Sequence, residues 1–285
     1  MHARSLCFAA TLLFSGLAHA DDSDTHIRAA YAANGDVARL TVTNGGKKPC
    51  VKIDLKGKGK EIYGGEAAAT IEAGHGLVVI AVSIDSEKKP FQIVTLKDGK
   101  LSTPVGLARP AKRENYPFAV AATPTPDGFT VFFQEVETAN PNEAHTYLVE
   151  LDKDGAVTKE PTEVQIPWAL AAAAWNGNGY HLGLFYTGGG GVTLSMVSTS
   201  ADGSPQQHPD WATPAGMITD VHLVANGKSI RAYYRGMGDR LYETDVSKIG
   251  QWGQVSQKAK DLGALSASQA IAISAKGAVT KVKAK

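Results

Sequence analysis

The feature that most constrains the fold is a glycine-containing turn that recurs six times along the chain. Its glycines are spaced 41 to 52 residues apart. Asn-Gly or Asp-Gly between two β-like runs is the strongest local signal for a β-hairpin, because the tightest hairpin turns need positive φ angles. The six turns are Asn34-Gly35, His75-Gly76, Asp127-Gly128, Asn178-Gly179, Asn226-Gly227 and Lys276-Gly277. The spacing predicts that the chain repeats one β-unit.

The runs on either side of these turns differ in composition. The run after each turn is rich in β-branched or aromatic residues, as in Phe129–Phe133, whereas the run before it is rich in small residues, as in Ala68–Ala73. Helix propensity alone would make the alanine-rich Ala169–Trp175 a helix. It occupies the same place in the repeat as clear strands, however, so we predict a strand. Small side chains suit the innermost strand of a ring, where neighbouring sheets crowd the axis.

A second series of hairpins lies out of phase with the first. Phe91–Leu96, Thr146–Leu151 and Thr193–Ser198 each lead into an Asp-Gly turn, and Val51–Leu55 and Leu241–Val246 are followed by glycines in weaker versions of the pattern. Four strands in a repeat of about 40–50 residues are typical of a β-propeller. A β-solenoid or a sandwich explains two interleaved turn series less directly.

The two series predict different numbers of blades. Six first hairpins and five second hairpins fit either a six-bladed ring whose last blade is incomplete or five full blades with an extra hairpin. Of these two arrangements we favour six blades.

One repeat also resembles that of a known family. The stretch Pro126–Phe133, followed by Tyr147–Asp152 and Asp154-Gly155, is similar to the repeat of TolB-type and related periplasmic propellers. The resemblance covers this repeat well and the others in outline, since they depart from the Pro-Asp-Gly pattern. It implies a periplasmic ring that works mainly through protein contacts.

The N-terminus has the pattern of a secretory signal peptide. Arg4 is followed by the apolar stretch Leu6–Leu17 and by Ala18-His19-Ala20, an A-x-A cleavage site. Removal of residues 1–20 would leave a single propeller domain over 21–285, exported to the periplasm or secreted. No later segment is long enough to span a membrane. Cys50 would be the one remaining cysteine, and we expect it to be a buried small hydrophobe.

Charge and motifs exclude several classes of function. Without Arg4 the chain has 28 basic and 28 acidic residues, so it has no net field that would attract nucleic acid. The sequence contains no nucleophile elbow, zinc-binding helix or phosphate-binding loop. The six histidines beyond the leader show no metal-ligand spacing. We therefore predict no metal site, and neither a cofactor nor a catalytic residue follows from the sequence.

A site is expected on one face of the ring. The links from second to third strands and from blade to blade share one face, here called the loop face, and loops carry function more often than strands. Its conspicuous charged and aromatic residues are Arg113, Glu114, Tyr116, Glu135, Trp168, Tyr186, Arg235 and Asp239. Arginine with aromatic residues suits an interface, and carboxylates beside an aromatic surface suit a sugar.

Three functions remain open at this point. The first is a binding module or scaffold of the cell envelope for a protein partner or a small-molecule or glycan ligand, and we favour it. The second is a glycan-active hydrolase or lyase with carboxylates such as Glu114, Glu135 and Asp239 around the axis. The third is a metal- or cofactor-dependent enzyme that uses histidines in strands.

Overall fold

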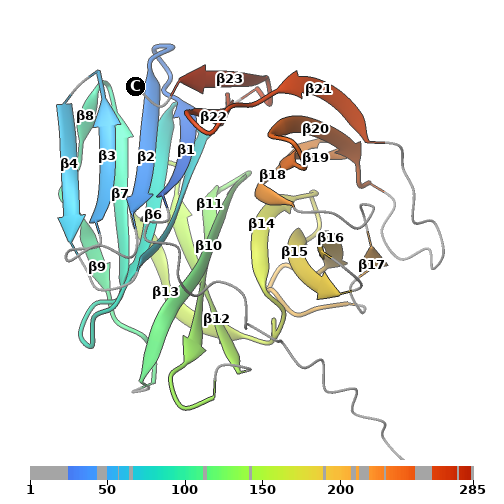
Figure 1. Ribbon diagram of the computed structural model, residues 1–285. Helices are drawn as coiled ribbons and strands as arrows, with labels where there is room; N and C mark the ends of the chain where they lie inside the picture. Colours follow the sequence, from blue (N-terminus) through green and yellow to red (C-terminus); the bar gives the residue numbers. More distant parts are fainter. Residues whose placement is uncertain are drawn as a thin grey trace, which may run out of the picture.

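The computed structural model describes residues 25–43, 50–56, 58–63, 67–111, 114–140, 143–188, 191–206, 210–211, 218–227, 229–247, 259–274 and 276–283. Within these ranges the chain forms strands, turns and bends and no helix, so no described helix could cross a membrane. The strands form five sheets arranged in a ring (Figure 1).

Each sheet corresponds to one blade of a β-propeller, and consecutive strands within a blade pair antiparallel. Blade one holds β1 (Thr25–Tyr31), β2 (Val37–Thr43), β3 (Cys50–Leu55) and β4 (Lys58–Tyr63). Blade two holds β5 (Ala67–Gly74), β6 (Leu77–Ile84), β7 (Phe91–Lys97), β8 (Lys100–Leu101) and β9 (Val105–Leu107), of which β8 and β9 both pair with β7. Blade three holds β10 (Asn115–Thr125), β11 (Gly128–Glu137), β12 (Ala144–Asp152) and β13 (Val157–Val164). Blade four holds β14 (Leu170–Trp175), β15 (Tyr180–Gly188), β16 (Gly191–Ser198) and β17 (Asp210–Trp211). Blade five holds β18 (Thr219–Asn226), β19 (Ser229–Gly236), β20 (Arg240–Asp245) and β21 (Lys260–Ala264).

The all-β propeller with four-stranded blades is confirmed, and of the two expected blade numbers the ring has five. The sixth first-type hairpin, β22 (Gln269–Ile273) and β23 (Val279–Lys283), forms no sheet of its own. Instead β22 pairs in parallel with β1 and extends blade one. Our preference for a sixth, incomplete blade was therefore wrong, because the two C-terminal strands find their hydrogen-bond partner in a blade that already exists.

In blades two to five the first strand lies innermost, as its small residues predict. Strand β10 packs against both β5 and β14, and β14 packs against β18. The predicted strand over the alanine run is confirmed as β14, in which Ala171 to Ala174 are buried. Their methyl groups leave room for neighbouring inner strands to approach each other near the axis.

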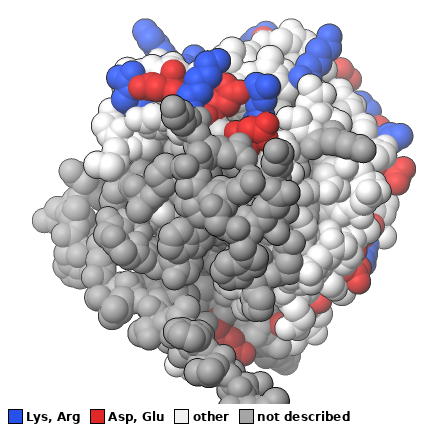
Figure 2. Space-filling model, turned by 90° about the vertical axis from the view of Figure 1, so that its right-hand side faces the viewer, with Lys and Arg blue, Asp and Glu red and all other residues white. Residues whose placement is uncertain are grey.

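Apolar clusters between adjacent blades hold the ring together. Phe91 of blade two stacks on Phe133 of blade three with ring centroids 4.6 Å apart, and both side chains are fully buried. Other clusters join blades one and two, three and four, and four and five. The described surface carries acidic and basic side chains side by side (Figure 2), for example Arg240 with Asp261, in keeping with a chain of almost no net charge.

Candidate functional site

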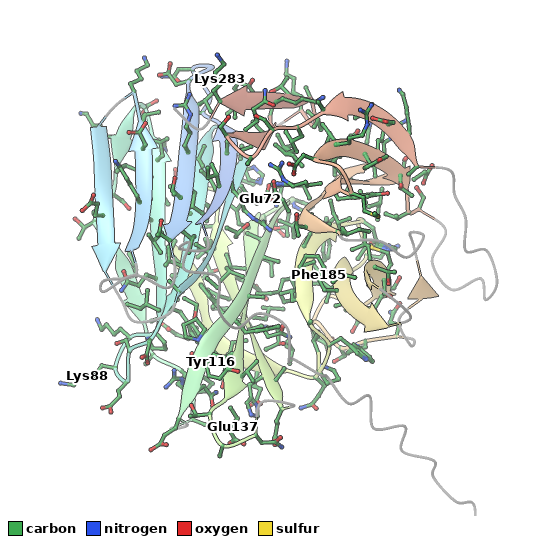
Figure 3. All side chains as sticks on the ribbon, viewed as in Figure 1. Glu72, Lys88, Tyr116, Glu137, Phe185 and Lys283 are labelled. Atoms are coloured by element: carbon green, nitrogen blue, oxygen red, sulfur yellow. The ribbon has the colours of Figure 1, made fainter. Side chains whose placement is uncertain are left out.

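Charged side chains from three inner strands meet in the middle of the ring. They are Arg28 on β1, Glu72 on β5, and Asp220 and His222 on β18. Figure 3 shows Glu72 where the inner strands converge. The sequence folds this way because each of these residues lies within a run of small or apolar residues that forms the first strand of a blade. We call Arg28, Glu72, Asp220 and His222 the axial cluster.

Arg28 connects the three strands. Its Nη1 donates a hydrogen bond to the hydroxyl oxygen of Thr70 on β5 at 3.0 Å, and its Nε lies 3.8 Å from Oδ1 of Asp220 on β18. The side chains of Arg28 and Asp220 keep 17% and 14% of their exposure. The ion pair is therefore strongly desolvated, yet solvent still reaches it.

Asp220 occupies a strained position. Its φ is 53°, a left-handed conformation that is uncommon for a residue other than glycine. The pairing of β18 with β19 shifts register between Thr219 and His222, so a β-bulge lies at Asp220. Bulges often reorient side chains next to functional sites, and strained backbone of this kind concentrates there. The bulge brings Oδ1 of Asp220 within 3.2 Å of Nε2 of His222.

The pKa values of the two acidic groups in the axial cluster are shifted in opposite directions. Burial raises the pKa of Glu72 to about 8, although the positive charge of Arg28 partly opposes this. Burial also acts to raise the pKa of Asp220, but the hydrogen bond and charge of His222, with the charges of Arg28 and Arg235, outweigh it. The pKa of Asp220 is therefore lowered. At neutral pH the axial cluster holds a largely protonated carboxylic acid and a carboxylate, both within the field of Arg28.

Stability should depend on pH through Glu72. Its folded-state pKa of about 8 lies above the unfolded value of about 4.5, so its contribution is fully present below pH 4.5 and is lost as pH rises through 8. We expect the thermal midpoint of the wild type to fall between pH 5 and pH 8 more than that of Glu72→Gln. The residual exposure of Glu72 moderates the effect. Parallel pH profiles of the two proteins would contradict the prediction.

One acceptor of the cluster lacks a partner. Oδ2 of Asp220 is buried, and no residue that the structure describes donates a hydrogen bond to it. Leaving such a group unsatisfied costs about 1–3 kcal/mol. With the protonated carboxyl of Glu72 as a donor, the cluster offers donor and acceptor groups to a polar molecule.

The eight residues expected at the loop face stay a prediction as a binding site, and the structure describes the side chains of six of them. Arg113 and the side chain of Tyr186 lie outside the described residues. Glu114 is exposed just before β10. Tyr116 is half-buried near one end of blade three, the end that also holds Glu137 in Figure 3. Trp168 packs against the apolar cluster between blades three and four.

Glu135 and Arg235 have structural partners. The carboxylate of Glu135 is fully buried and accepts two hydrogen bonds from Arg109, at 2.9 and 2.7 Å. The guanidinium of Arg235 donates to the backbone carbonyls of Leu265 and Gln269 and lies 3.4 Å from Asp239, whose side chain is 64% exposed. These contacts give both residues a structural role that requires no ligand. Any binding role for them stays a prediction.

Sequence reasoning missed the axial cluster because it looked for function in loops. The available signal was a charge inside an inner strand. Arg28, Glu72 and Asp220 interrupt the small-residue runs Ile27–Ala33, Ala68–Ala73 and Ile218–Ala225. A strand that lies beside the axis of a ring brings such a charge close to its counterparts on other blades. Spacing along the chain cannot show that meeting.

No protein-family model and no curated protein sequence matches the chain. Among solved structures it is similar to the N10 neuraminidase-like protein of A/little yellow-shouldered bat/Guatemala/060/2010, with 11% identity over 90% of this chain and 89% of that chain and a TM-score of 0.51. A triple arginine-to-alanine mutant of AofleA from Arthrobotrys oligospora matches with 9% identity, 92% and 76% coverage and a TM-score of 0.51. The fucose-specific lectin from Aleuria aurantia matches with 13% identity, 91% and 86% coverage and a TM-score of 0.47.

At identities this low, the structural similarity to the first two of these proteins shows the fold and nothing further. The likeness of blade three to the TolB-type repeat stays a prediction. What the geometry and the structural neighbours together show is that this chain is an all-β propeller of five four-stranded blades.

Proposed function

We propose that this chain is an exported binding module of the cell envelope, and that it holds a hydroxyl-rich ligand such as a glycan at the axial cluster. The proposal keeps the export signal in residues 1–20 and the favoured binding function. It moves the site from the loops to the inner strands. Propellers and other closed β-rings bring side chains from several blades to one point, which suits recognition of a compact polar molecule.

The unpartnered Oδ2 of Asp220 carries the proposal. A buried carboxylate oxygen beside a guanidinium accepts a ligand hydroxyl strongly, because charge-assisted hydrogen bonds are about twice as strong as neutral ones. Arg28 and the protonated Glu72 supply donors to the oxygens of the same molecule. A ligand without hydroxyl groups would leave these buried groups unsatisfied, and such sites discriminate strongly against it.

Binding should depend on Arg28 and Asp220. We expect Arg28→Met and Asp220→Asn each to weaken binding of a neutral glycan at least about tenfold, a loss of roughly 1.4 kcal/mol. Calorimetric titration of a glycan selected on an array measures the effect. Arg231→Met is the matched control, since Arg231 is half-exposed and pairs with Glu243 on blade five. Wild-type affinity in both axial variants would refute the site, and binding of an envelope protein but no glycan would refute the ligand class.

A second candidate function, a glycan hydrolase, has its own supporting observation. A raised pKa on one carboxyl and a lowered pKa on another, both beside Arg28, is the arrangement that separates a general acid from a base or nucleophile. In this alternative Glu72 protonates the leaving oxygen and Asp220 acts on the opposite side of the bond. Of the carboxylates first considered, Glu135 is bound to Arg109, whereas Glu114 and Asp239 are exposed; a role for them in such a reaction stays a prediction.

Turnover would distinguish the two functions. If the chain is a hydrolase, a panel of 4-nitrophenyl glycosides should include a substrate whose cleavage falls at least about a hundredfold in Glu72→Gln. The rate should also decline as pH rises past 8, when Glu72 loses its proton. Tight binding of a glycan without cleavage, unchanged by Glu72→Gln, supports the binding module and excludes hydrolysis by this pair.

A further inference from the structure

Blade three contains a cavity that the axial cluster does not use. Its volume is about 460 Å³, and its described lining comes from the start of β12 with residues just before it, and from the end of β13 with residues just after it. The polar side chains that matter there are Asn140, Glu143, His145 and Glu163. A space of this size is within the range that holds small organic molecules.

The charge in this cavity is arranged around one imidazole. Nδ1 of His145 lies 2.8 Å from Oε1 of Glu163, and Nε2 of the same ring lies 3.7 Å from Oε1 of Glu143. The side chain of His145 is 8% exposed, whereas those of Glu163 and Glu143 are 30% and 54% exposed. The imidazole ring is therefore a buried part of the cavity lining, and the carboxylates of Glu143 and Glu163 beside it are partly exposed to solvent.

The lining is negative on a chain that is nearly neutral overall. Among the lining residues that the structure describes there are two carboxylates and no lysine or arginine. Asn140 orients one of them, because its amide Nδ2 donates to Oε2 of Glu143 at 3.4 Å. A cation entering the cavity would find carboxylate acceptors on both sides of the imidazole ring.

The geometry favours an organic cation over a metal ion. The carboxylates approach opposite nitrogens of the ring, so they do not converge on one point, and no group of three metal-ligating side chains occurs in the part of the chain that the structure describes. Ammonium donors tolerate acceptors spread over several ångströms, whereas a metal ion demands short, convergent ligands.

We propose that this cavity is a second binding site, separate from the axial cluster, for a small organic cation that carries primary ammonium groups. Glu143 and Glu163 accept its N–H donors, and His145 holds Glu163 in position. A linear diamine fits the site better than a monoamine, because the two carboxylates lie on either side of the ring. The ligand class follows from the cavity alone and does not depend on the proposed glycan site.

Titration of the full mature chain with 1,4-diaminobutane at low ionic strength tests the proposal. We expect saturable binding of one molecule, at least about tenfold weaker in Glu143→Gln/Glu163→Gln and weaker for butylamine than for the diamine. Glu150→Gln is the matched control: Glu150 lies on β12 of the same blade, pairs with Lys159, and does not line the cavity. Its affinity should equal that of the wild type.

Chemical-shift mapping on the wild type gives a readout that needs no variant, with the largest changes expected at His145 and its neighbours in the cavity. Absence of saturable diamine binding would overturn the proposal, as would equal binding by 1,4-butanediol or by the double variant. Displacement of the diamine by Zn²⁺ or Ca²⁺ at equal stoichiometry would instead identify a metal site. Loss of glycan binding in Arg28→Met with diamine binding intact would show that the two sites bind their ligands independently.

Discussion

Replacing Arg109 with methionine is expected to lower the free energy of unfolding by about 3–5 kcal/mol, because it leaves a buried carboxylate without its cation. The side chain of Arg109 is 7% exposed and that of Glu135 is 0% exposed, and the two form a bidentate pair. Asn115 adds a hydrogen bond to the same carboxylate at 3.3 Å. Denaturant unfolding followed by fluorescence measures the change.

A double substitution separates the cost of an unpaired buried charge from the contribution of the ion pair itself. Arg109→Met/Glu135→Met should recover most of the lost stability, since replacing both partners of a buried ion pair by apolar groups is often neutral or favourable. Lys159→Met is the surface control: its pair with Glu150 is about 40% exposed, so the expected loss is below about 1 kcal/mol. A loss at Arg109 no larger than at Lys159 would contradict the argument.

The location of this ion pair explains its large expected effect on the free energy of unfolding. Arg109 follows β9 of blade two, and Glu135 lies on β11 of blade three, so the pair joins the end of blade two to blade three. From the sequence, we predicted a binding role for Glu135 because its charge lies in an expected loop. In the structure its burial and its bidentate partner give it a structural task, which no pattern of neighbouring residues could have indicated.

Local signals predicted the hairpins well. Positive φ at His75 and Gly76, for instance, is what a two-residue hairpin turn requires, and the turn joins β5 to β6 as expected. The same reasoning identified β14 as a strand despite its alanines, because position within a repeat outweighs intrinsic propensity. Where turn chemistry and repeat spacing agreed, the sequence contained enough information to place the strands.

Long-range pairing was the part that local signals could not decide. The Lys276-Gly277 turn correctly predicted a hairpin, yet nothing in β22 or β23 specifies which sheet they join. The parallel pairing of β22 with β1 connects residues more than 240 positions apart, for example Ala272 with Ala29. The axial cluster has the same origin, since Arg28 meets Asp220 only after the ring has closed.

The second large effect is expected at this closing hairpin, β22–β23, which lies between the last blade and the first. One side of β22 presents Ile271 and Ile273 to a cluster with Tyr233 and Leu241 of blade five. The other side presents Ala270 and Ala272 to Ala29 of blade one. Removing residues 267–285 would uncover both surfaces and leave Arg235 without one of its two backbone acceptors, the carbonyl of Gln269. We expect the truncated chain to lose cooperative unfolding.

A point substitution keeps the test measurable if truncation prevents folding. Ile271 is fully buried, so Ile271→Ala should lower the free energy of unfolding by about 2–5 kcal/mol, whereas Val105→Ala, at a side chain 48% exposed, should change it little. Because the hairpin contacts blades one and five, amide exchange should accelerate in β1 and β19 before it does so in β11. Uniform acceleration in all blades, or a truncated chain with wild-type stability, would mean that five blades close the ring unaided. The predicted pattern would mean instead that the C-terminal strands close it, and that the axial cluster depends on their presence.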